Sequence, residues 1–464
     1  MLALPGTMRV ARSGARRLAA DLSRRKLLRY AEPDVTLQKR SAFDSQPDGW
    51  ARGAVVPTSL APPPPRTGAA IAVVDDFVDS ANPDVGPQTS YLNGPGAVLG
   101  GHGTEVASAA AGAANGTGVV GVFPGARILS YGTNLSCGDV AAGVVTAADA
   151  GASVINLSLG NPNPCFTLFV AVQLAYGEGS LVVAAGGNEF AQGNAVQFPA
   201  AFPHVLSVAA VDPSLQAAFF SNANLSIDLA APGLDVPVAV PPAFDPDGVP
   251  DGVTLDTGTS FAAPIVAGAA AWLATARPSL RNGQIADVLR NSATDLGRRG
   301  YDPDTGFGLL NVPGALRARA PRVDPLEPND DIPFIDGTAF ARPDPYLWRG
   351  HGRLGLRASV DQVEDPVDVY RIRVPGRASF RIRLRPTFGD PDLTVFSSRA
   401  RTIDSRRTII ARSRRGEGRT DAVALVNRGR RAARAYVMVN AAEDFQGNIN
   451  ASYRLRFLRL RGRR

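Results

Sequence analysis

Two polar residues stand at or near the expected starts of helices, where a side chain can be aimed at a reacting group. Ser260 lies in the segment 257–264, followed by the small-residue run 266–273, and is expected at the start of the closely packed helix that this run predicts. The amino end of a helix carries unpaired N–H groups and a positive dipole end, which suit a serine whose reaction intermediate bears an oxyanion. His102 follows glycines and precedes a second small-residue helix, expected over residues 105–113. Each has an ordinary alternative, because serine is a common helix cap and a lone histidine usually serves packing.

Two further polar residues follow buried strands. Asp75 comes directly after the apolar run 71–74, and Asn188 follows the apolar run 182–185 and two glycines. A carboxylate at the end of a buried strand can cap a helix or orient a histidine. The side-chain N–H of the asparagine can reach a ligand, or the residue can simply form a turn. None of the four residues decides the function alone.

The elements that position these residues follow from the hydrophobic pattern. Residues 69–316 alternate short apolar runs with Gly- and Ala-rich helical stretches, which predicts a parallel sheet covered by helices on both faces. Such sheets carry functional groups at the carboxyl ends of their strands. After residue 317, runs such as 369–374 and 380–384 alternate apolar and polar residues. We therefore expect an α/β fold followed by a separate antiparallel β-sandwich.

Asp, His, Asn and Ser in this order resemble the subtilisin-like serine proteases, the subtilases. Asp75 lies in AVVDDFVDSANPDV, His102 in HGTEVA, Asn188 in AAGGNE and Ser260 in GTSFAAPIVAG. The resemblance covers about residues 45–316 and implies an α/β serine endopeptidase that needs no cofactor for catalysis. It assigns Asp75, His102 and Ser260 to a catalytic triad, and Asn188 together with the Ser260 backbone N–H to the oxyanion hole.

The resemblance also implies how a polypeptide substrate binds. An extended substrate would add as a strand along Ser158, Leu159 and Gly160, through main-chain hydrogen bonds. The first specificity pocket would be lined by Ala185, Gly186 and Gly187. Walls this small leave room for a large apolar side chain.

Two departures from the family pattern bear on activity. Asp76 and Phe77 follow the aspartate, where subtilisins usually have Ser or Thr and then Gly. An extra acid there resembles the kexin branch, which favours basic substrates, but the rest of the histidine motif does not resemble kexin, and simple divergence is the alternative. Glu105 stands where the histidine motif often has a second histidine. A catalytically inactive scaffold that binds partners through its β-sandwich is therefore the alternative function.

Four residues have expected structural roles. Asp84 and Asn115 match ligand positions of the family's tight calcium site, with a plain Asn-Gly turn as the alternative. Cys137 and Cys165 are the only two cysteines, and each is expected after a strand, at the same edge of the parallel sheet. We predict a disulfide between them, which fits an exported protein, with two free buried thiols as the alternative.

The net charge is +7, and the basic residues are almost all arginine. The densest runs, 406–407, 414–415 and 428–431, lie between strand-like stretches and lack the interleaved aromatics of a base-stacking platform. We therefore expect a solvated surface and no nucleic-acid partner. No window is expected to be long and apolar enough to span a membrane. The protein is expected to be a monomer that acts on polypeptides.

The ends of the chain resemble known appendages of secreted proteases. Residues 28–34 resemble the end of a subtilase propeptide, an intramolecular inhibitor, so residues 1–45 are expected to be its remnant. The catalytic domain is expected over 46–318. The sandwich, over 319–464, resembles the pre-peptidase C-terminal type. The first residues lack the apolar run of a signal peptide. We nonetheless expect an extracellular protein with a start upstream of Met1, and a cytoplasmic enzyme is the alternative.

Overall fold

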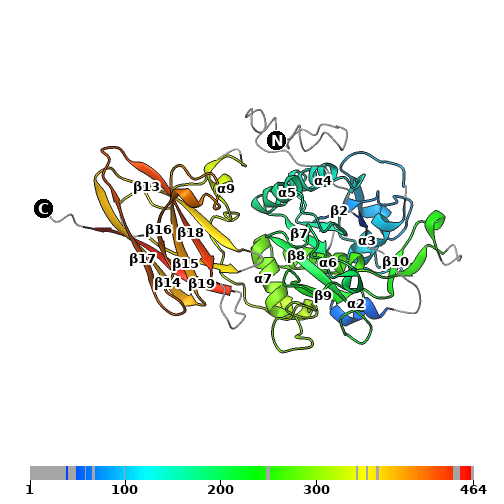
Figure 1. The fold of residues 1–464 in the computed structure, drawn as a ribbon. Helices are drawn as coiled ribbons and strands as arrows, with labels where there is room; N and C mark the ends of the chain where they lie inside the picture. Colours follow the sequence, from blue (N-terminus) through cyan, green and yellow to red (C-terminus); the bar gives the residue numbers. More distant parts are fainter. Residues whose placement is uncertain are drawn as a thin grey trace. The chain divides into compact units, whose positions relative to one another are not determined.

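The computed structural model describes residues 38–39, 49–57, 59–64, 68–98, 100–246, 251–340, 343–351, 354–361, 365–442 and 450–460. The chain divides into two compact units, which in the main comprise residues 3–321 and 322–464 (Figure 1). Most of the segment expected to be a propeptide lies outside the described residues. Its described part is the short strand β1 (Gln38–Lys39).

A seven-stranded parallel sheet forms the centre of the first unit, in the order β3–β4–β2–β5–β7–β8–β9. Strands β2, β5, β7 and β8 are buried along their whole length, because helices cover both faces of the sheet. The predicted α/β architecture is confirmed. The strands are β2 (Ile71–Asp75), β3 (Thr89–Tyr91), β4 (Ile128–Gly132), β5 (Val154–Leu157), β7 (Leu181–Ala185), β8 (Val205–Val211) and β9 (Leu229–Pro232).

Two pairs of helices cover this sheet from opposite sides. Val73 belongs to the hydrophobic core shared with α3 and α6, whereas its neighbour Val74 contacts Gly143 of α4. Successive residues of a strand point to opposite faces, so α3 and α6 lie on one face and α4 and α5, which pack together, on the other. The helices of this unit are α2 (Trp50–Val55), α3 (His102–Ala111), α4 (Cys137–Asp149), α5 (Phe166–Gly177), α6 (Thr259–Ala276), α7 (Asn282–Ser292) and α8 (Val312–Arg317).

The strand order reverses at β2, which has β4 on one side and β5 on the other. In open parallel sheets, the carboxyl ends of the strands at such a reversal form a crevice in which ligands bind. Asp75 is the last residue of β2. The fold thus places this carboxylate at the position where a site is expected.

Several short elements complete the first unit. Strand β1 pairs antiparallel with β6 (Leu159–Gly160), and β10 (Val236–Ala239) pairs antiparallel with β11 (Val253–Asp256). Single turns of 3₁₀ helix are η2 (Gly86–Gln88), η3 (Phe190–Gln192) and η4 (Pro242–Phe244).

One helix departs from the prediction that no stretch is long and apolar enough to span a membrane. Among the described residues, α6 is long and apolar enough to cross a bilayer by length and composition. However, 83% of its 18-residue window is buried inside the unit. Its small side chains let it run through the core against α3 and the sheet, and the core helix of a soluble protein passes the same test.

The second unit is the predicted antiparallel β-sandwich. Its first sheet has the order β12–β19–β14–β17 and its second the order β13–β18–β15–β16. Alternate residues of both sheets, such as Ile382 and Val437, fill the core between them. The elements are α9 (Ile332–Asp336), β12 (Leu354–Asp361), β13 (Val367–Val374), β14 (Ala378–Phe388), β15 (Pro391–Ser397), η5 (Arg406–Thr408), β16 (Ile409–Ser413), β17 (Asp421–Asn427), β18 (Ala433–Ala441) and β19 (Asn450–Leu460).

Candidate active site

Asp75 and His102 form a buried pair at the reversal of the sheet. Both carboxylate oxygens of Asp75 lie 2.9 Å from Nδ1 of His102. The backbone N–H of Asp76 donates to Asp75 Oδ1 at 2.7 Å and helps to hold the carboxylate. With its Nδ1 proton directed at a carboxylate, the imidazole has Nε2 as its proton acceptor. The pair therefore has the geometry of a carboxylate that orients a general base.

His102 reaches this position because α3 begins at His102 itself, three residues earlier than the helix predicted from the sequence. The next residue, Gly103, lies so close to the backbone oxygen of Asp76 that a Cβ atom would collide with it. A glycine is required here because the first turn of α3 presses against the end of β2.

Ser260 lies in the first turn of α6 and is fully buried. Its hydroxyl donates to the carbonyl oxygen of Ser158 at 3.3 Å, and the Ser158 hydroxyl donates back to the carbonyl oxygen of Ser260 at 2.7 Å. The ring of the following residue, Phe261, lies 5.8 Å from the ring of His102, centroid to centroid. The start of α6 is thus held against the chain after β5 and beside the imidazole.

Asn188 follows β7, and its amide oxygen is held by the residue that precedes Ser260. The backbone N–H and the hydroxyl of Thr259 both donate to Asn188 Oδ1, at 2.9 and 2.8 Å. The same hydroxyl accepts the backbone N–H of Gly187 at 3.1 Å. Because two donors fix the amide oxygen, the Asn188 Nδ2 group is presented as a donor. Sequence reasoning identified Asn188 but missed Thr259, since nothing in the sequence indicates this contact.

The segment predicted to bind substrate already pairs with another part of the chain. Ser158 and Leu159 are fully buried, and β6 forms an antiparallel ladder with β1 in which Gln38 lies opposite Gly160 and Lys39 opposite Leu159. An extended segment can therefore add as a strand at this position.

The residues predicted to line a specificity pocket are tightly surrounded. Ala185 belongs to the hydrophobic core, and a Cβ atom on Gly186 would lie 2.7 Å from Ile227 Cδ1. Gly187 has a φ of +112°, and a Cβ atom there would collide with the side chain of Asn222. Glycine is thus required at Gly187 by backbone conformation as well as by space.

A carboxylate beside these glycines was not predicted. Glu189 Oε2 accepts the backbone N–H of Asn188 at 3.1 Å and the side-chain amides of Gln197 and Asn222 at 3.2 and 3.3 Å. The Glu189 carboxylate thus hydrogen-bonds to the chain after β7, to Gln197 and to Asn222, beside the predicted pocket wall. Only the tertiary structure shows this convergence, because Asn222 lies 33 residues from Glu189 in the sequence.

Glu105, the departure from the histidine motif, lies one turn along α3 from His102 and is buried. Burial raises the pKa of Asp256, at the end of β11, and a hydrogen bond with Glu105 and the proximity of His102 partly offset this rise. Two carboxyl groups therefore meet beside the imidazole. Sequence reasoning singled out Glu105 but gave no signal for Asp256 as its partner.

Asp84 and Asn115, the residues predicted to bind calcium, do lie together. Asp84 is buried, and its carboxylate accepts Asn115 Nδ2 at 2.9 Å and the backbone N–H of Val119 at 2.7 Å. Gly118 packs directly on the same carboxylate. The loop thus surrounds a buried anion with N–H donors. The backbone N–H and hydroxyl of Thr117 donate to Asn115 Oδ1 at 3.1 and 3.2 Å, which holds the amide with Nδ2 toward Asp84.

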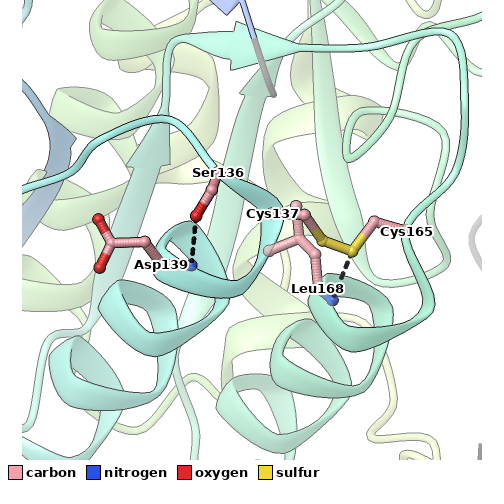
Figure 2. The surroundings of a disulfide bond; sticks show 5 residues. All are labelled: Ser136, Cys137, Asp139, Cys165 and Leu168. Carbon is pink, nitrogen blue, oxygen red and sulfur yellow. Dashed lines mark hydrogen bonds between the residues drawn. A yellow bond between two sulfur atoms is a disulfide. The ribbon is translucent and has the colours of Figure 1, made fainter. Parts of the chain in front are cut away.

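The predicted disulfide between Cys137 and Cys165 is confirmed, with 6.5 Å between their Cα atoms. Figure 2 shows that the two cysteines join the starts of α4 and α5. Ser136 caps α4 by accepting the N–H of Asp139, and Cys165 Sγ accepts the N–H of Leu168 at the start of α5. The bridge therefore fixes the two helices that cover one face of the sheet.

The sandwich contains acidic groups that sequence reasoning did not connect with a metal. Carboxylate oxygens of Asp324, Asp365 and Asp368 lie within 4.8 Å of one another. Burial raises the pKa of Asp368 to about 6, and burial together with neighbouring carboxylates raises the pKa of Asp365 and Glu327 well above the usual range. Such a set of buried oxygens can share protons or coordinate a hard cation.

Comparison with known proteins agrees with this geometry. The sequence profile described as "Subtilase family" matches residues 66–308, just over half of the chain. Subtilisin Savinase from Lederbergia lenta is 37% identical over 262 residues, which cover 54% of this chain and 91% of that protein. Fervidolysin from Fervidobacterium pennivorans is 35% identical over 291 residues, which cover 55% of this chain but only 41% of that protein.

Solved structures show the same fold. The crystal structure of fervidolysin, a keratinolytic enzyme related to subtilisin, aligns with a TM-score of 0.52 at 20% identity and covers 80% of this chain and 74% of that one. The S41 psychrophilic protease aligns with a TM-score of 0.50 at 26% identity and covers 57% of this chain and 97% of that one. Together with the sequence profile and the subtilisin relative, the fold defines the class of subtilisin-like serine proteases. The chain belongs to the subtilase family, a family of serine endopeptidases.

Proposed function

We propose that this chain is a serine endopeptidase in which Asp75, His102 and Ser260 act as a catalytic triad. The observation that carries the proposal is the contact of both Asp75 carboxylate oxygens with His102 Nδ1 at 2.9 Å. That contact fixes the imidazole tautomer at the reversal of the sheet, beside the helix that bears Ser260. A carboxylate–imidazole pair next to a serine at a helix start is an arrangement for nucleophilic catalysis.

The reaction follows from the tautomer. His102 Nε2 takes the proton of the Ser260 hydroxyl as Oγ attacks the scissile carbonyl carbon, and a tetrahedral intermediate forms. The Asp75 carboxylate stabilises the resulting imidazolium. The imidazolium then gives its proton to the leaving amine, the C–N bond breaks, and an acyl group remains on Ser260. Water repeats the sequence with His102 as base, which releases the second product and regenerates the serine.

The negative charge of the intermediate needs fixed donors. We propose that Asn188 Nδ2 and the Ser260 backbone N–H supply them, because Thr259 holds the other end of the Asn188 amide through two hydrogen bonds. A donor that is already oriented does not have to reorganise when the charge develops, so no free energy is lost to reorganisation.

We propose that polypeptide substrates add as a strand to Ser158, Leu159 and Gly160, and that the amino-terminal segment does the same as an intramolecular inhibitor. The antiparallel pairing of Gln38–Lys39 with β6 supports both parts of this proposal. An inhibitory segment of this kind leaves the site open only after cleavage and release. The Cys137–Cys165 bridge supports an extracellular location, where disulfides form and persist.

We further propose that Asp84 and Asn115 bind a structural calcium ion, which would require the Asn115 amide to exchange its contacts with Thr117 and Pro83 for the ion. Calorimetry of metal-stripped protein tests this site: added calcium should raise Tm, and the rise should be lost in Asp84→Asn. If calcium leaves the Tm of the wild-type protein unchanged, no such site exists.

Hydrolysis of a neutral peptide anilide tests the central proposal, using protein from which the segment before residue 46 has been removed. Ser260→Ala and His102→Ala should each lower kcat by about 10⁶, the size of loss found in subtilisin itself, which is the source of that figure. Ser292→Ala is the matched control, because its hydroxyl only contacts the carbonyl of Leu289 within α7, and it should keep full activity. Folded wild-type protein that hydrolyses no peptide would instead support the inactive binding scaffold.

A further inference from the structure

The first sheet of the sandwich presents a dense array of arginines on its outward surface. We define the arginine face as Arg357 of β12, Arg381, Arg383 and Arg385 of β14, and Arg454 and Arg456 of β19. These residues alternate along their strands with side chains that point toward the sandwich core, such as Ile382, Leu384 and Leu455. The six guanidinium groups therefore leave the sheet on the same side.

Strand register places these arginines directly beside one another. Arg454 lies opposite Arg357 on one neighbouring strand and opposite Arg385 on the other, so three arginines form a row across the sheet. Arg456 lies opposite Arg383 in the next row. Side chains at opposite positions have Cβ atoms about 4.5–5.5 Å apart, a separation at which like charges destabilise a sheet.

No ion pair within the described part of the chain involves this charge, and a carboxylate near the face, that of Asp324, accepts hydrogen bonds from Ser359, two residues from Arg357. None of the six arginines makes an ion pair or a side-chain hydrogen bond with any described residue. Among the described outward positions of the four strands, Asp361 at the end of β12 is the sole carboxylate, four residues along the strand from Arg357. The face thus costs folding free energy until an anion covers it, and arginine suits that role because its planar fork binds carboxylates through two hydrogen bonds.

The spacing of the arginine face fits an extended polypeptide. Arg381, Arg383 and Arg385 follow one another at every second residue, so they are separated by about 6.6–6.8 Å along β14. Alternate side chains of an extended peptide have the same repeat. Positions opposite the arginines are occupied by small or aliphatic residues, namely Gly355, Ala422, Ala424 and Leu458, which leave the surface open. One exposed ring, Phe388, lies opposite Ser452 at the edge of the array, which falls short of the series of rings on which successive nucleic-acid bases stack.

We propose that the arginine face binds acidic segments of polypeptide substrates, as a second binding surface separate from the residues that act on the peptide bond. This substrate class rests on the proposed endopeptidase function, because polypeptides are then the molecules that the protein must capture. Binding itself does not depend on catalysis, so the two proposals can fail independently.

Binding of fluorescent poly-L-glutamate to the full-length Ser260→Ala protein tests the proposal by anisotropy at low and high salt. Arg381→Ser/Arg383→Ser/Arg385→Ser should weaken binding at least tenfold, and high salt should abolish the difference. The matched control is Arg428→Ser/Arg430→Ser/Arg431→Ser, which removes the same charge from an exposed loop between β17 and β18 and should change affinity less than twofold.

Two results would overturn the proposal. One is an equal loss of affinity in the two triple variants, because net charge alone would then explain binding. The other is tighter binding of a heparin fragment or of oligothymidylate than of poly-L-glutamate at equal charge, which would assign the face to a different polyanion. In the active protein, the face variant should raise KM for a peptide with a glutamate tail and leave the neutral peptide unaffected. Failure to cleave the neutral peptide would count only against the endopeptidase.

Discussion

Replacing Thr259 by valine tests how the oxyanion donor is held. The Thr259 hydroxyl donates to Asn188 Oδ1 at 2.8 Å and accepts the N–H of Gly187 at 3.1 Å, and valine has nearly the same shape without the hydroxyl. The backbone N–H of Thr259 still donates to Asn188 Oδ1 in the variant, at 2.9 Å. The substitution therefore removes one of the two restraints on the amide and leaves the donor in place.

The expected size of the effect follows from these contacts. A neutral hydrogen bond contributes about 1 kcal/mol net, which corresponds to a five- to tenfold loss in kcat if the Asn188 donor is misaligned by that much. Removing the asparagine donor altogether costs about 10²–10³ in kcat in subtilisin, which sets the upper limit. The Gly187 N–H also loses its acceptor, so the free energy of unfolding should fall by about 1–3 kcal/mol.

Steady-state kinetics on a peptide anilide measure this effect, with kcat expected to fall and KM expected to stay constant. Thr257→Val is the control, since the Thr257 hydroxyl accepts the N–H of Asp235 at 2.9 Å without contact to Asn188, and should lower stability while sparing kcat. In an Asn188→Ala background, Thr259→Val should have no further effect on kcat. An equal loss of kcat in both backgrounds, or none in either, would refute the positioning role.

Two further predictions concern stability. Cys137→Ser/Cys165→Ser opens a loop with a sequence separation of 28 and should lower the free energy of unfolding by about 3–4 kcal/mol, measured by urea titration. If reduction of the wild-type protein leaves its urea midpoint unchanged, the disulfide does not contribute to stability. In the sandwich, burial raises the pKa of Asp368 to about 6 and that of Asp365 well above its usual range. Protonation therefore favours the folded state, and in the presence of chelator this contribution to Tm should be complete below about pH 4 and be lost as the pH rises through 6. Asp365→Asn should flatten this decline, and a Tm that rises from pH 5 to 8 would contradict the assignment.

The position of the candidate site could be predicted because it depends on strand ends. Apolar runs such as 71–74 and 182–185 mark parallel strands whose carboxyl ends lie at one edge of the sheet. Asp75 follows the first run directly, and Asn188 follows the second after two glycines. The disulfide could be predicted for the same reason. The helix start at His102 was placed too late, because the sequence does not show that Gly103 allows α3 to press against β2.

Contacts between distant segments could not be predicted. The hydrogen bonds of Thr259 to Asn188 join residues 71 positions apart. The convergence of Glu105 with Asp256 depends on how β10, which pairs with β11, packs against α3. The arginine face shows the same limit. Its period-two alternation is visible in each strand, but only the strand register shows that Arg383 lies opposite Arg456.

Active-site labelling with a fluorophosphonate probe, followed by digestion and mass spectrometry, tests the central claim most directly. The proposed triad predicts one adduct, on the peptide that contains Ser260, which disappears in Ser260→Ala and is strongly reduced in His102→Ala. Ser292→Ala should label like the wild type. An adduct that persists in Ser260→Ala, or folded wild-type protein that stays unlabelled after removal of residues 1–45, would contradict the assignment of Ser260 as the nucleophile.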